Sequence, residues 1–145
     1  MKRLFLIIFL CLAASNAFAG GTMFIKVDNV VYEVELYDNS AAKSLADSLP
    51  QNISMSRWGG EYYGKLSGTI DISNDKTQDV FKVGEVALWV SGNSLCIFFG
   101  PTPASKGTEP RMASPGVALG LIKGDVSALN SMSSSINAVV TLVRD

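Results

Sequence analysis

Short stretches in which every second residue is apolar constrain the fold of this chain more than any other feature. Two of them flank Asp28-Asn29: Met23, Ile25 and Val27 alternate with polar or aromatic neighbours, and residues 30–37 repeat the pattern. A side-chain period of two is typical of a strand with one buried face. Two such strands joined by an Asp-Asn turn predict a β-hairpin.

One segment changes to the period of a helix. The apolar residues of 41–49 recur at helical spacing after Asn39 and its polar neighbours, which can cap a helix, and Pro50 ends the pattern. Residues 126–132 predict one or two further helical turns. Strands are expected in the segments 61–68, 69–73, 86–90, 95–100, 117–125 and 134–145.

About eight strands with one or two short helices, and no β-α-β rhythm, indicate a mainly β protein. So many strands in one small domain favour a closed or nearly closed barrel, because closure removes exposed sheet edges. A β-sandwich is the alternative. The proline-rich segment Pro101–Pro115 is expected to be a long, stiff loop.

The N-terminal residues have the pattern of a signal peptide. Lys2 and Arg3 precede an apolar run that is too short to span a bilayer, and Ala17-Phe18-Ala19 fits a cleavage site. We therefore expect a signal peptide over 1–19 and one domain over 20–145. The expected location is periplasmic or secreted, with no membrane insertion after cleavage.

The composition narrows the chemistry. The chain has no histidine, which excludes Ser-His-Asp and Cys-His catalysis, and its scattered acids form no metal-binding motif. Cys96 lies in an apolar run and is expected to be buried and inert. We expect no catalytic residue, no metal and no cofactor. With 12 basic and 13 acidic residues, nucleic acid is not an expected partner. A monomer or weak oligomer is expected.

The stretch "SRWGGEYYG" (Ser56–Gly64) concentrates the candidate functional residues. In a structural interpretation, two glycines bend the chain, the aromatic residues pack in the core or at its rim, and Arg57 and Glu61 form a surface ion pair. In a functional interpretation, Arg57 and Trp58 line a pocket with one of the two tyrosines. Tyr62 and Tyr63 are adjacent, so on a strand they point to opposite faces.

The same stretch resembles the R-W-G-x-E-Y-Y signature of the cyclophilin-like family of small bacterial β-barrel proteins. "VYEVELYDNSAAKSLADSLP" and "KVGEVALWVSGNSLCIFFGPTP" resemble further motifs of that family in the same order, and the likeness spans Phe24 to Arg144. The resemblance implies a cyclophilin-type closed barrel. Prolyl isomerases of this fold carry F-H-R and Q-G-G-D motifs, where this chain has Met55–Trp58 and then Gly59–Glu61, so catalytic roles are not carried over.

We therefore expect an exported, non-catalytic module that binds a peptide or a small ligand such as an anion, with the proline-rich loop as a lid. A weak peptidyl-prolyl isomerase that uses Arg57 is one alternative, and a structural or interaction domain in an envelope complex is the other. The candidate ligand-binding residues are Arg57, Trp58, Glu61, Tyr62, Tyr63, Phe98 and Phe99.

Overall fold

The computed structural model describes residues 20–144 of the chain. The predicted signal peptide, 1–19, lies outside the described residues. The elements are β1 (Gly21–Val27), β2 (Val30–Leu36), α1 (Ser40–Asp47), β3 (Gln51–Trp58), β4 (Glu61–Lys65), β5 (Gln78–Val80), β6 (Glu85–Trp89), β7 (Ser94–Phe98), β8 (Arg111–Ile122), the 3-10 helix η2 (Ser127–Ser131) and β9 (Ser135–Thr141).

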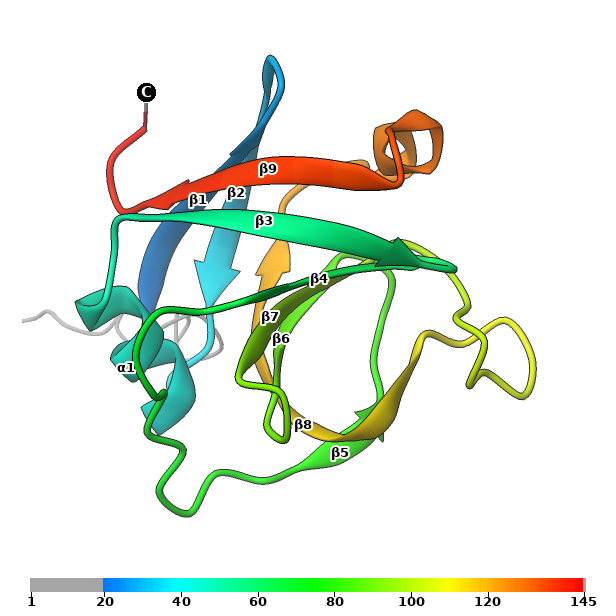
Figure 1. Ribbon diagram of the computed structural model, residues 1–145. Helices are drawn as coiled ribbons and strands as arrows, with labels where there is room; N and C mark the ends of the chain where they lie inside the picture. Colours follow the sequence, from blue (N-terminus) through cyan, green and yellow to red (C-terminus); the bar gives the residue numbers. More distant parts are fainter. Residues whose placement is uncertain (1–19, 145) are drawn as a thin grey trace, which may run out of the picture.

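The strands form a closed barrel, as the sequence predicts (Figure 1). Their order is β2-β1-β9-β3-β4-β7-β6-β8-β5, and a pairing between β2 and β8 joins the two ends of the ring. Strand β5 pairs only with β8 and stands outside the ring, so eight of the nine described strands make the barrel wall. Closure leaves the wall strands without a free edge.

The predicted first hairpin is confirmed. Strands β1 and β2 pair from Val27↔Val30 to Gly21↔Leu36, and Asp28 in the turn has a positive φ of 55°. The alternating apolar side chains of the hairpin are buried in the barrel core, which they share with side chains from the other wall strands. The period-2 pattern therefore identifies the inward face.

Helix α1 forms in the segment for which the sequence predicts a helix. It lies at one end of the barrel (Figure 1). The Asn39 side chain accepts a hydrogen bond from the Ala42 N–H at 2.8 Å. The carboxylate of Asp75, far along the chain, accepts from the N–H groups of Ser40 (3.1 Å) and Ala41 (2.7 Å). Three of the N–H groups that a helix start leaves unpaired are thus satisfied, and the apolar face of α1 packs on the core.

Strands β6 and β7 are buried on both faces, which explains their continuous apolar sequences. Val86, Leu88, Leu95 and Ile97 point into the barrel core. The alternate residues join a second, smaller cluster outside the wall, formed by Phe81, Ala87, Cys96, Phe98 and Met112. A second layer, made by β5, the 101–110 segment and the start of β8, covers this part of the wall. Cys96 is buried and free, as predicted.

Two predictions about local structure are wrong. Residues 69–73 form no strand: the N–H of Asp71 is bound by the Ser44 hydroxyl at 2.9 Å, and Ile70 is buried in the core without a sheet partner. The predicted loop 101–115 ends early, because β8 begins at Arg111. Pro115 is tolerated in this strand since it lies within a register shift between β8 and β5.

Candidate functional site

A tight hairpin positions the residues of the "SRWGGEYYG" stretch. Trp58 on β3 pairs with Glu61 on β4, and Gly59 and Gly60 connect them. Gly59 has a φ of +61°, which favours glycine. A Cβ atom on Gly60 would lie 2.3 Å from the carbonyl carbon of Gly100, so the hairpin packs directly on the chain that follows β7. The Gly60 N–H donates to the Pro101 carbonyl at 2.7 Å.

The hairpin divides the candidate residues between two faces of the barrel wall. Arg57 pairs with Tyr62, and the strand period places both on the inward face. Trp58, Glu61 and Tyr63 lie on the outward face. Because Arg57 and Glu61 point to opposite faces, the surface ion pair considered for them is wrong.

The inward residues close one end of the barrel. The Arg57 guanidinium lies 4.9 Å above the Phe99 ring and donates from Nη1 to the Asn130 carbonyl at 2.9 Å. Tyr62 is fully buried, donates from its hydroxyl to the Ser133 carbonyl, and packs against Phe99 with 5.4 Å between ring centroids. These three residues therefore tie the hairpin to the segment before β9.

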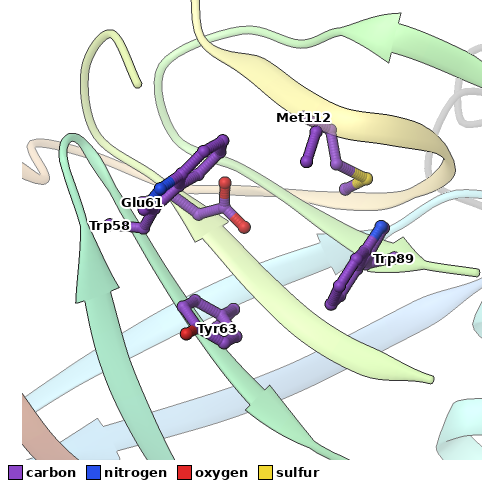
Figure 2. A pocket seen from close by; sticks show the side chains of 6 residues that line it. Trp58, Glu61, Tyr63, Trp89 and Met112 are labelled. Carbon is purple, nitrogen blue, oxygen red and sulfur yellow. The ribbon is translucent and has the colours of Figure 1, made fainter. Parts of the chain in front are cut away.

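The outward residues border a pocket of about 240 Å³. It is lined by Trp58, Glu61, Tyr63, Trp89, Met112 and Ala113. In Figure 2 the Glu61 carboxyl group points into the space between the Trp58 ring, the Met112 side chain, Tyr63 and Trp89. Phe98, also a candidate, lies in the outer cluster beneath, fully buried and stacked on Phe81.

Small side chains on β7 allow two rings from more distant strands to meet. Strand β7 separates β4 from β6, and Cys96 and Ser94 occupy its outward positions beside Tyr63 and Trp89. The two rings reach across β7 to a perpendicular contact with 6.5 Å between their centroids. The Trp89 indole is fixed by a 2.7 Å hydrogen bond from Nε1 to the Ser114 hydroxyl and by contact with Gly92.

Glu61 is the acidic group of the pocket, and one of its two carboxyl oxygens lacks a partner. Its residue is only 4% exposed, and its Oε1 atom is buried without a hydrogen-bond partner. Burial raises the pKa of Glu61 to about 7, and hydrogen bonding with the neighbouring Cys96 thiol, a weak donor, acts in the opposite direction. Within residues 20–144, no cationic group lies within ion-pair distance of Glu61.

Sequence reasoning found half of the pocket. Trp58, Glu61 and Tyr63 line it, whereas Arg57, Tyr62 and Phe99 lie on the other face of the wall. Trp89, Met112 and Ala113 were not predicted. Trp89 lies near the end of a predicted strand that pairs with β7. Its partner Ser94 is two residues from the outward-facing Cys96, so the strand period could have placed Trp89 on the outer face. Met112 was hidden because its segment was expected to be a loop.

The 101–110 segment is held by its own hydrogen bonds. The Thr102 hydroxyl donates to the Arg111 carbonyl, and the Ser105 hydroxyl donates to the Glu109 carbonyl. The Glu109 carboxylate accepts from the N–H groups of Lys106 and Gly107, each at 2.8 Å. These contacts tie the segment to itself and to the start of β8, and its expected role as a lid stays a prediction.

No helix within residues 20–144 is long and apolar enough to cross a membrane. Over the same residues, no group of three or more acidic or cysteine side chains is arranged to hold a metal ion.

The fold and the site together define a closed eight-stranded barrel with an aromatic pocket on its outer wall. The family model described as "Cyclophilin-like" matches residues 22–141, and the chain belongs to this family. The solution structure of the hypothetical protein AF2241 from Archaeoglobus fulgidus is similar, with 30% identity and a TM-score of 0.65, covering 85% of this chain and 95% of that chain. Curated proteins give no significant match.

Proposed function

We propose that this protein is a non-catalytic binding module and that the outer-wall pocket takes a small ligand or a peptide side chain. The observation that supports the proposal is the pocket itself: three aromatic side chains and a methionine surround one buried carboxyl group. A concave, mostly apolar site with a single convergent polar group is the usual form of a small-ligand site.

The placement of Arg57 favours binding over isomerase activity. An isomerase of the expected type would use this guanidinium to polarise a proline amide, but it lies on the opposite wall face from the pocket and is held by Asn130 and Phe99. The expectation of an anionic ligand also depended on Arg57. The pocket offers a carboxyl group instead, which repels anions.

Tryptophan fluorescence provides the experiment. The sequence contains two tryptophans, Trp58 and Trp89, and both line the pocket. We expect that some members of a panel of short peptides and small organic compounds change the emission and raise the melting temperature. Trp89→Ala should abolish the rise in melting temperature, whereas the control Val30→Ala, on an exposed position of the first hairpin, should retain it.

A panel without any hit would contradict the proposal and would favour the alternative of a structural or interaction domain. Hits that stabilise the Trp89→Ala variant as much as the original protein would also contradict it, because the ligand would then bind elsewhere.

We also propose that the module acts outside the cytoplasm, on the basis of the sequence of residues 1–19. The mature protein is then expected to begin at Gly20 in the periplasmic or secreted fraction, which intact-mass measurement can determine. An uncleaved chain in the cytoplasmic fraction would contradict export.

A further inference from the structure

We propose that the ligand of the outer-wall pocket carries a substituted ammonium ion, whose positive charge lies against the Glu61 carboxylate and the surrounding aromatic rings. The inference rests on the proposed binding function and adds the chemical class of the ligand.

The carboxyl group of Glu61 has a buried oxygen without a hydrogen-bond partner. Buried polar groups in proteins are nearly always hydrogen-bonded, and a buried charge needs a partner. Tyr37 and the Lys82 N–H provide such partners for Glu85, the other buried acid of the described chain. Oε1 of Glu61 has none. Apart from the weakly donating Cys96 thiol, Glu61 thus has no partner of the kind that holds Glu85, and a cation in the pocket would provide one.

The walls of the pocket favour the same charge. Trp58, Tyr63 and Trp89 border the space around the carboxyl group, and the faces of aromatic rings attract cations through their quadrupole. The sulfur of Met112 adds a polarisable contact. The single acid and the three rings therefore agree in selecting a positive ligand, whereas an anion would be repelled by Glu61.

The kind of cation follows from the apolar lining. A metal ion needs several oxygen ligands, and among residues 20–144 Glu61 is the only carboxylate that lines the pocket. An alkylated ammonium ion spreads its charge over methyl or methylene groups, so it loses little hydration and gains contact with the rings. Aromatic sites with one acidic residue are suited to this type of ligand.

The proposal implies a direction for the pH dependence of binding. The titratable groups beside Glu61 are the Tyr63 phenol on the same strand and the Cys96 thiol on β7, while Trp58, Trp89 and Met112 carry no charge. A cation binds the ionised carboxylate, and burial raises the pKa of Glu61 to about 7. Affinity should therefore increase as the pH rises through 7.

A matched pair of probes tests the inference. Choline carries a trimethylammonium group, and 3,3-dimethyl-1-butanol has the same shape without the charge. Each is titrated at pH 6 and pH 8 while tryptophan fluorescence is recorded. We expect choline to bind about tenfold more tightly at pH 8 than at pH 6, in proportion to the ionised fraction of a group with a pKa of about 7. The neutral probe should bind more weakly, without this dependence.

The variants locate the charge. Glu61→Gln keeps the shape of the side chain, and it should lose the preference for choline and its pH dependence. Glu35→Gln removes one negative charge from β2, away from the pocket, and should behave as the original protein. If Glu61→Gln fails to fold, the ratio of the two probe affinities in the original protein remains the test.

The failures can be told apart. Equal affinity for the two probes would overturn the cation inference and leave the proposed binding function standing. Unchanged choline binding by Glu61→Gln would overturn it as well. If neither probe changes the tryptophan emission, the cation inference is wrong, and the peptide and compound panel decides the binding function separately.

Discussion

Glu61 links the stability of the free protein to pH. Burial raises the pKa of this carboxyl group from 4.5 to about 7, so the folded protein holds the proton more tightly than the unfolded chain does. The stabilisation is therefore fully present below about pH 4.5 and is lost as the pH rises through 7. A shift of this size corresponds to about 3 kcal/mol.

The pH dependence can be measured by urea unfolding of the original protein and of Glu61→Gln between pH 4.5 and pH 8.5. The difference in free energy of unfolding between the two should change by about 3 kcal/mol over this range, in favour of the variant at high pH. A difference that stays constant with pH would show that Glu61 titrates at its ordinary pKa.

Arg57 is predicted to stabilise the fold without taking part in ligand binding. It bonds the Asn130 carbonyl and lies over Phe99, on the wall face opposite the pocket. We expect Arg57→Ala to reduce the free energy of unfolding by about 1 kcal/mol, because the contacts are partly exposed. Its affinity for ligands of the pocket should be unchanged. A loss of affinity at full folding would contradict this placement.

For single residues, the sequence indicated which stretch holds the site better than it indicated the face toward which each side chain points. Aromatic and charged residues in one stretch indicated a site, and the strand period required Tyr62 and Tyr63 to separate. It did not determine which tyrosine points outward. The outward direction depends on the second layer that covers the wall. This layer includes Phe81, just after β5, and Met112 on β8, which are both far from the hairpin in sequence.

At the scale of elements, the Gly59-Gly60 hairpin depends on close contact with the chain after β7. Gly60→Ala would place a methyl group 2.3 Å from the backbone of Gly100, and we expect a loss of roughly 1–3 kcal/mol in stability. Gly100→Ala is the matched control, because its added atom would meet the nearest atom of Gly60 at an ordinary 3.8 Å. Chemical unfolding of both variants measures the difference, and equal losses would contradict the packing described.

The elements themselves were largely predictable where local chemistry decides them. The β1–β2 hairpin and helix α1 follow from turn residues, period and capping, and both are confirmed. The conformation of residues 69–73 was not predictable in this way. Ile70 and Ile72 alternate with polar residues as in a strand, but Ile70 is buried against the core without a sheet partner. The start of β8 was missed since Pro115 argues against a strand, and the register shift that accommodates it cannot be seen in sequence.

At the scale of the whole molecule, the pairing of β2 with β8 closes the barrel, and the two strands approach closely there. A Cβ atom on Gly120 would lie 2.6 Å from the Glu35 carbonyl oxygen. Gly120→Ala should therefore weaken the β2–β8 pairing. Amide exchange should accelerate more at Leu36 and Leu121, on these two strands, than in the β3–β9 pair. An equal acceleration of amide exchange across all strands would contradict this, because the β2–β8 pairing would then not open separately.

The proposed function depends on a ligand binding on the outer wall, between the β3–β4 hairpin and strands β6 and β8. Amide and indole NMR spectra, recorded while a ligand from the panel is added, test it most directly. We predict that both indole signals shift together with the amides of Glu61, Tyr63 and Met112, while the amides of Arg57 and Asn130 change little. Shifts confined to another surface, such as the groove formed by Pro50, Leu142 and Val143, would contradict it.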